Sequence, residues 1–133
     1  MRLVLDPNVL IAAVVADGVC RDLVRVRLRP HTIITSEILL RELREKLRVK
    51  FNLTADEMPL LAMLSERAET VKSAKFSPPV CRDADDDWVL ATALAGRAEF
   101  IITGDADLLA LKKHGDIRIL APRAFLEFLD RQK

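Results

Sequence analysis

Acidic residues directly follow two apolar segments of this chain. Asp6 comes after the apolar residues 3–5, and Asp105 and Asp107 lie in the turn after the apolar residues 100–102. Parallel strands place their carboxyl ends at one edge of a sheet, where open α/β folds bind their ligands. If both segments are strands of one parallel sheet, we expect their aspartates to lie close together at that edge.

A third acidic group, residues 85–87, begins a segment with a helical pattern. Carboxylates stabilise the N-terminus of a helix, but a single cap needs only one of these three aspartates. Asp87 is spaced three and seven residues from Leu90 and Leu94, so we expect it on an apolar helical face directed toward the sheet. Asp87 is therefore the predicted contribution of this helix to a site.

Glu42 is a fourth candidate, on a helix that Ser36 is expected to cap. It lies about 100° around this helix from the leucine stripe at positions 39, 43 and 47. At that position a carboxylate can contribute to a site or form a surface ion pair with a basic neighbour on the same helix.

The four acids Asp6, Glu42, Asp87 and Asp105 come from four separate segments. Asp6 and Asp105 each fit a helix N-cap without any chemistry. Convergence on a divalent cation explains all four together, because neighbouring carboxylates do not all ionise cheaply and their hard oxygen atoms suit Mg²⁺ or Mn²⁺. A metal so held would activate a water molecule and stabilise charge on a phosphate, which predicts metal-assisted phosphodiester hydrolysis.

Strands and helices alternate along the chain, which predicts an α/β fold with a parallel sheet covered on both faces. The predicted strands are residues 2–5, 32–35, 70–72, 100–103 and 117–120. The predicted helices are residues 8–16, 22–28, a segment from 36 onward, 54–67, 85–95, 105–113 and a last one from 122. Gly96 is expected to end the fifth of these helices in a left-handed conformation. We find no linker or repeat, so we expect one domain over residues 1–133.

The composition is that of an ordinary globular protein, with 50% hydrophobic and 31% charged residues. The longest apolar run, residues 9–16, is too short to cross a membrane, so we expect a cytoplasmic protein. Cys20 and Cys81 are far apart and form no CxxC pair, which argues against a zinc site or a disulfide framework.

Charge is unevenly distributed along the chain. Residues 21–50 contain nine basic and four acidic residues, whereas residues 82–107 contain two basic and seven acidic ones. An acidic pocket beside a basic surface suits a polyanionic substrate, although arginine-rich helices also occur as merely solvated faces. We expect Arg41, Arg44 and Arg48 to contribute to the binding of such a polyanion.

Four segments together resemble the PIN-domain family, and more closely the VapC-like ribonuclease toxins of toxin-antitoxin modules. They are residues 5–9, residues 39–43, residues 83–91 and residues 102–109, and they occur in the order found in that family. Each motif is weak alone, but the four together are fairly specific and span nearly the whole chain.

The resemblance implies a single PIN-like nuclease domain with a five-stranded parallel sheet between helices. It implies that Asp6, Glu42, Asp87 and Asp105 bind Mg²⁺ or Mn²⁺ and catalyse RNA cleavage. Asn8 and Thr103 would support the site by hydrogen bonding. Asp107 and Asp86 would be further supporting acids. Asp86 is also the second candidate, after Asp87, for the third acid of the quartet. The partners implied are RNA, a cognate antitoxin and a second copy of the chain in a homodimer.

Two other functions are compatible with parts of the sequence. A HAD-like or receiver-like phosphotransfer domain would use Asp6 as a covalent nucleophile, but Asn8 stands where that class carries a second aspartate. A non-catalytic PIN-like binding module would be expected to have lost acidic residues, whereas all four positions are acidic here.

Overall fold

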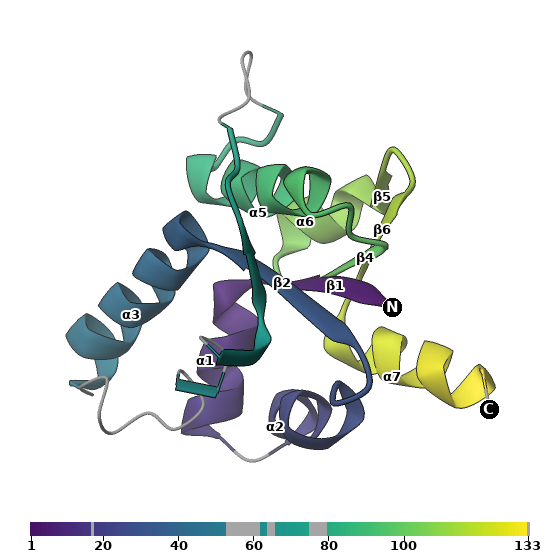
Figure 1. Cartoon of the computed structure of the whole chain (residues 1–133), viewed down its shortest axis with the longest axis horizontal. Coiled ribbons are helices and arrows are strands. Elements are labelled where there is room, and N and C mark those ends of the chain that lie inside the picture. The colour runs from purple at the N-terminus through teal and green to yellow at the C-terminus, as the bar shows by residue number, and fades with distance from the viewer. Residues whose placement is uncertain (17, 53–61, 64–65, 75–79, 133) are drawn as a thin grey trace.

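Six strands form one sheet in the order β3-β2-β1-β4-β6-β5 (Figure 1). The computed structural model describes residues 1–16, 18–52, 62–63, 66–74 and 80–132. The strands are β1 (Arg2–Leu5), β2 (Thr32–Ser36), β3 (Glu69–Val71), β4 (Phe100–Ile102), β5 (Lys113–His114) and β6 (Ile117–Leu120). All pairings are parallel except that of β5 with β6. The predicted five-stranded parallel sheet is confirmed, and a short antiparallel edge strand extends it.

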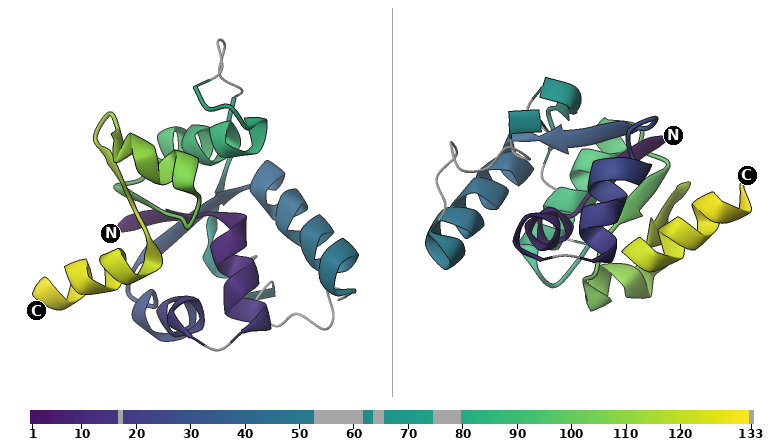
Figure 2. Two further views of the ribbon diagram at one scale, coloured as in Figure 1. Left: turned by 180° about the vertical axis from the view of Figure 1, so that it is seen from behind. Right: turned by 90° about the horizontal axis from the view of Figure 1, so that it is seen from below.

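Helices cover both faces of the sheet, as predicted. They are α1 (Pro7–Val15), α2 (Val19–Asp22) with a π-helical turn η1 (Leu23–Arg27), α3 (Glu37–Phe51), α5 (Ala84–Ala95), α6 (Ala106–Leu111) and α7 (Pro122–Arg131). Helices α5 and α6 lie on one side of the sheet, and α1, α2 and α7 lie on the other (Figures 1 and 2). Helix α3 flanks the sheet next to α1 and α5.

Alternation of side chains along the strands divides the interior into two cores. Leu3 and Leu5 of β1 pack into the core beneath α1 and α7, whereas Val4 between them packs into the core beneath α5. Ile102 and Ile101 of β4 divide in the same way. A strand buried on both faces appears in a sequence as a continuous apolar run, which is why these strands were predictable.

Short polar residues start the helices that leave the carboxyl edge of the sheet. The side chain of Asp6 accepts a hydrogen bond from the amide of Asn8 at the start of α1, and Ser36 accepts from the amide of Leu39 in α3. Asp105 caps α6 in the same way. These caps place several aspartate side chains at the edge where the strands end.

The structure corrects the prediction for the end of α5. Gly96 has φ −91°, and the left-handed conformation falls on Arg97 with φ 54°. A glycine is needed at position 96 because an added Cβ atom would collide with the side chain of Ile34.

Two further sequence predictions have other outcomes. Helix α6 ends at Leu111 and not at residue 113, because residues 113–114 form β5. The predicted helix over residues 54–67 lies largely outside the described residues. Among the described residues, no helix is both long and apolar enough to cross a membrane.

Candidate active site

The ends of β1 and β4 form the centre of the candidate site. The two strands are parallel neighbours, with Leu5 opposite Ile102, so Asp6 and Thr103 leave the sheet side by side. The hydroxyl group of Thr103 donates a hydrogen bond of 2.7 Å to Oδ2 of Asp6, and both side chains are buried. Oδ1 of Asp6 accepts from the amide of Asn8 at 3.0 Å. Each carboxylate oxygen keeps a lone pair for another ligand.

Thr103 also connects this carboxylate to the next turn of the chain. Its oxygen accepts a hydrogen bond of 3.0 Å from the backbone amide of Asp105. The side chain of Asp105 in turn accepts from the amide of Leu108 at 2.9 Å and so caps α6. The hydroxyl group of Thr103 therefore connects the turn that contains Asp6 to the turn that contains Asp105.

Asp86, in the first turn of α5, completes the acidic group. Carboxylate oxygens of Asp86, Asp105 and Asp107 lie within 4.8 Å of one another. Asp86 is 8% exposed, and its burial, together with the charge of Asp105, raises its pKa to about 7. Burial is the larger of these two causes, and a positive charge beside the carboxyl group would lower the value.

Asp107 lies at the exposed margin of this group. It forms an ion pair of 2.7 Å with Arg82, whose side chain is largely exposed. Because exposed ion pairs of this kind contribute little energy, Arg82 neutralises the cluster only weakly.

Glu42 approaches the same region from α3. It forms an ion pair of 2.9 Å with Lys46 one turn later, and Lys46 also donates to the side-chain oxygen of Asn8 at 3.4 Å. Burial raises the pKa of Glu42, the hydrogen bond from Lys46 opposes this, and the charges of Asp85 and Asp6 add to it. Glu42 is therefore within electrostatic reach of Asp6, although its charge is already paired with a lysine.

Asp87 is buried, as its expected orientation toward the interior requires, but it is not one of the three acids whose carboxylate oxygens lie within 4.8 Å of one another. Its carboxylate accepts hydrogen bonds from the backbone amides of Val80, at 3.1 Å, and Cys81, at 2.7 Å. Burial and the hydrogen bond to Asp87 raise the pKa of the Cys81 thiol to about 12. On the face expected for Asp87, Leu90 and Ala91 are buried but Leu94 is 46% exposed, whereas Leu90 and Ala93, at four and seven residues from Asp86, are both buried.

The donor set suits a hard divalent cation. Asp6, Asp86 and Asp105 offer carboxylate oxygens only, and among the described residues none of the three forms an ion pair with lysine or arginine. Mg²⁺ and Mn²⁺ prefer such ligands. Burial, followed by the charge of Asp105, raises the pKa of Asp86, and a bound cation would favour its ionised form.

Comparison with known protein families identifies the family to which this fold belongs. A family model described as the PIN domain matches residues 2–107. The chain belongs to the PIN-domain family. No curated protein matches this PIN domain significantly.

A solved structure supports the same fold. The PIN domain is similar to a chain in the crystal structure of VapBC2 from Rickettsia felis bound to a DNA fragment from their promoter. The TM-score is 0.62 with 17% sequence identity, and the alignment covers 90% of this chain and 97% of the other. At this identity the likeness concerns the fold of the PIN domain.

The structure brings together most of the acids predicted from the sequence. Asp6, Asp105 and Asp107 lie in or beside one group, and Glu42 lies near it. Asp86, the second candidate for the third acid, belongs to this group, and Asp87 does not.

Two residues of this region were not singled out from the sequence. Lys46 contacts both Glu42 and Asn8, and its signal was its position four residues after Glu42. Trp88, the single tryptophan of this PIN domain, lines a pocket with Glu42 and carries no such positional signal.

Proposed function

We propose that this chain is a divalent-metal-dependent endoribonuclease and the toxin of a toxin-antitoxin module. One observation carries the proposal: at the carboxyl edge of a PIN-domain sheet, carboxylate oxygens of Asp86, Asp105 and Asp107 lie within 4.8 Å of one another, and Thr103 joins Asp6 to the turn that carries Asp105. Among the described residues, Asp6, Asp86 and Asp105 form no ion pair. We take the whole chain, residues 1–133, as the nuclease domain, since Phe125 and Leu129 of α7 pack into the same core as β1.

Asp6, Asp86 and Asp105 would hold Mg²⁺ or Mn²⁺, with Glu42 and Asp107 beside them. A bound divalent ion lowers the pKa of water and stabilises charge on a phosphate. Thr103 orients Asp6 by donating to one oxygen, and the amide of Asn8 holds the other. We therefore propose a quartet of Asp6, Glu42, Asp86 and Asp105, in which Asp86 replaces Asp87 as the third acid.

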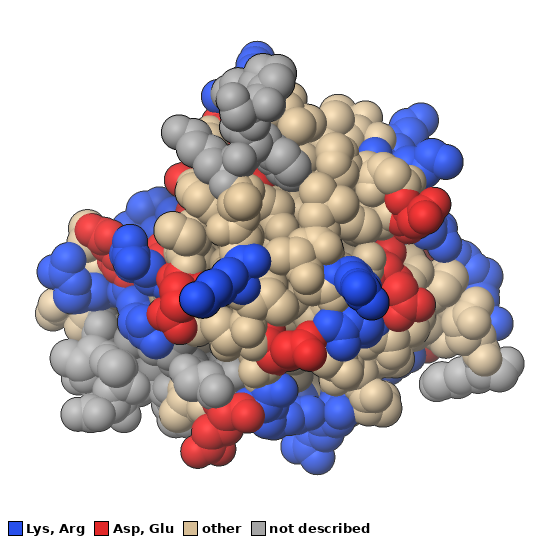
Figure 3. Space-filling view, turned by 45° about the horizontal axis from the view of Figure 1, so that its top comes forward, with Lys and Arg blue, Asp and Glu red and all other residues tan. Residues whose placement is uncertain are grey.

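Basic side chains on α3 would hold the RNA backbone. Arg41, Arg44 and Arg48 are exposed at three- and four-residue spacings, which places them along one side of the helix. In Figure 3, Lys and Arg side chains lie on the side of the molecule where α3 lies, with acidic side chains among them, and further Lys and Arg side chains lie at the centre and on the opposite side. Replacing all three arginines with glutamine should weaken RNA binding and flatten its salt dependence by a slope of about 0.7 for each phosphate contact. An unchanged slope would assign these arginines to a solvated surface.

We also propose a cognate antitoxin and a second copy of the chain as partners, in the cytoplasm. The support is the likeness to a chain of VapBC2, which was crystallised with a promoter DNA fragment. Copurification of the chain with the product of a neighbouring gene, followed by its mass in solution, would test both partners.

The decisive experiment is incubation with pooled RNA and pooled DNA, in Mn²⁺ and in chelator, with mapping of the cut ends. We expect internal cuts in RNA only when the metal is present. Cleavage in excess chelator would rule out the metal site. A trapped aspartyl phosphate on Asp6 would favour phosphotransfer, and full cellular function of a cleavage-dead variant would favour a binding module.

A further inference from the structure

A pocket of about 360 Å³ lies beside the acidic group. Its lining comes from α3 and the start of α5 and consists of Ile38, Arg41, Glu42, Glu45, Lys46, Asp85 and Trp88. This volume falls within the range of roughly 300–1,000 Å³ that is typical of small-molecule sites. Because Glu42 belongs both to the pocket and to the proposed quartet, a ligand in the pocket would lie next to the reacting phosphate.

Trp88 gives the pocket an aromatic wall. The residue is partly buried and packs against the core beneath α5, so its position is held by the fold. The described residues provide no hydrogen-bond partner for its indole N–H. Ile38 adds an aliphatic surface on α3. A flat, partly exposed indole held in place is suited to stack on a planar ring.

The charges of the pocket suit a nucleotide. Arg41 is exposed on its rim and can contact a phosphate, while Lys46 is held by Glu42 and Asn8. Glu45 and Asp85 carry carboxylates, which accept hydrogen bonds from the amino groups of nucleobases. A pocket that combines an apolar wall, an exposed cation and hydrogen-bond acceptors has the groups needed to hold a base attached to its phosphate.

We propose that this pocket is the subsite for one nucleobase of single-stranded RNA adjacent to the phosphate being cleaved, with Trp88 as its stacking platform. The inference rests on the proposed ribonuclease function and adds the part of the substrate that the site recognises. Trp88 is then a specificity-determining residue, because it contacts a base and takes no part in the reaction at the phosphate.

Tryptophan fluorescence tests the subsite without any cleavage. Trp88 is the single tryptophan of the chain, which has no tyrosine, so the emission reports on this position alone. In chelator, a short single-stranded oligoribonucleotide should quench the emission of the full-length protein in a saturable manner. An abasic oligomer of the same length should quench it much less. Equal quenching by the two oligomers, or none by either, would overturn the proposed base subsite.

Substitutions then connect the pocket to cleavage. Trp88→Leu should weaken oligonucleotide binding, measured by anisotropy of a labelled RNA, by about fivefold or more. Trp88→Phe should keep most of the affinity. With Mn²⁺, Trp88→Leu should raise KM and change the preferred cut positions while kcat stays near that of the wild type. Ile38→Glu, at a partly exposed position, is a second variant that should weaken binding if Trp88→Leu fails to fold.

The outcomes separate this inference from the proposed function. A wild type that cleaves RNA, combined with unchanged KM and cut positions in Trp88→Leu, overturns the subsite alone. A wild type that cleaves no RNA in Mn²⁺ overturns the ribonuclease function, and with it the role given to the pocket. Quenching by an antitoxin-derived peptide but not by RNA would assign the pocket to a protein partner and overturn the base subsite.

Discussion

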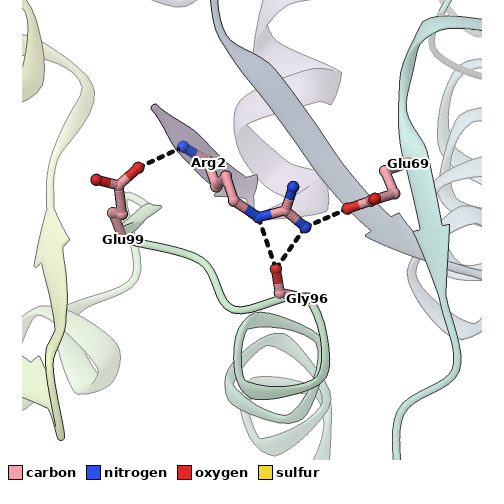
Figure 4. A network of polar contacts seen from close by, with 4 residues as sticks. All are labelled: Arg2, Glu69, Gly96 and Glu99. Atoms are coloured by element: carbon pink, nitrogen blue, oxygen red, sulfur yellow. Dashed lines mark hydrogen bonds and ion pairs between the residues drawn. The ribbon is translucent and has the colours of Figure 1, made fainter.

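Charged residues are paired differently at the two ends of the strands, which are the amino edge, where the parallel strands begin, and the carboxyl edge, where they end. At the amino edge, the guanidinium group of Arg2 forms an ion pair with Glu69 and donates twice to the carbonyl oxygen of Gly96, at 2.7 and 3.0 Å (Figure 4). The backbone amide of Arg2 donates to Glu99 at 2.8 Å. Every charged group of this network has a partner of opposite charge or a hydrogen-bond donor.

At the carboxyl edge, the acids face one another. Asp86 and Asp105 are close enough for one to raise the pKa of the other, and Asp6 adds to the effect. Like charges placed together cost free energy unless a cation joins them. Charges at the amino edge are thus paired within the protein, whereas Asp86 and Asp105 at the carboxyl edge have no ion-pair partner among the described residues.

Asp86 and Asp87 repeat this contrast within one helical turn. Both are buried, but Asp87 accepts two backbone amides whereas Asp86 faces Asp105. The largest expected effect follows from this difference. Asp86→Asn should lower metal-dependent RNA cleavage by more than about 100-fold, because the proposed metal site would lose one of its charged ligands. Cleavage assays should include Asp116→Asn, an exposed aspartate in the turn before β6, as the matched control. Equal cleavage by wild type and Asp86→Asn would remove Asp86 from the site.

Metal binding should stabilise the folded protein through the carboxyl edge alone. Mn²⁺ at about a hundred times its dissociation constant should add roughly 2.7 kcal/mol to the free energy of unfolding. The melting temperature should rise by several degrees in the wild type and hardly at all in Asp86→Asn. If Mn²⁺ does not change the melting temperature of the wild type, these acids do not converge on a metal.

Without metal, the same acids should make stability depend on pH. The pKa of Asp86 is raised to about 7 from the model-peptide value of 3.8, so the folded state retains a proton that the unfolded chain releases. The free energy of unfolding in chelator should therefore fall as the pH rises from about 4 to about 7. Asp86→Asn should lose part of this slope in denaturant titrations at several pH values.

Asp87→Ala should act on stability and leave metal binding in place. The substitution leaves the amides of Val80 and Cys81 without their acceptor, which costs about 1–3 kcal/mol. We expect a lower free energy of unfolding in denaturant and an undiminished rise in melting temperature on addition of Mn²⁺. Loss of the Mn²⁺ effect in a variant that is otherwise folded would return Asp87 to the metal site.

The smallest effect is expected at the amino edge, from His31. Its Nδ1 lies 3.0 Å from the amino-terminal nitrogen, and burial, followed by the amino-terminal charge, lowers its pKa from 6.5. A lowered pKa means that stability is present above about pH 6.5 and is lost as the pH falls through the folded value. His31→Gln should remove this small loss in melts below about pH 6.5, opposite in sign to the effect of Asp86. An identical pH profile in the variant would show that His31 does not contribute.

The fold was largely predictable because each parallel strand is a short apolar run that ends at a polar turn. Residues 2–5 and 117–120 were assigned as strands with the bounds that the structure shows. Strand β5 was missed because Lys113 and His114 have no apolar pattern and pair only through their hydrogen bonds to β6. Gly96 was correctly placed at the end of α5, but the reason lies in its contact with Ile34, which is distant in sequence.

The candidate site was predictable at the level of segments and less so at the level of single residues. Asp6 and Asp105 follow strands, so their convergence depends only on the sheet being parallel. The choice between Asp86 and Asp87 depends on about 100° of helical rotation and on the amides of Val80 and Cys81. No local pattern specifies where that preceding loop places its amides, so the choice requires the tertiary structure.

Helix α5 connects the two edges of the sheet, and this gives the Arg2 network a second consequence. The helix has 12 residues and is therefore about 18 Å long, with Asp86 near one end and Gly96 directly after the other. A tilt of about 2° at the Gly96 end would displace Asp86 by roughly 0.5 Å, which is the tolerance within which reactive groups must be held. The guanidinium group of Arg2 donates two hydrogen bonds to the carbonyl oxygen of Gly96 and so holds this end of the helix. The position of Asp86 thus depends on a residue at the opposite end of helix α5.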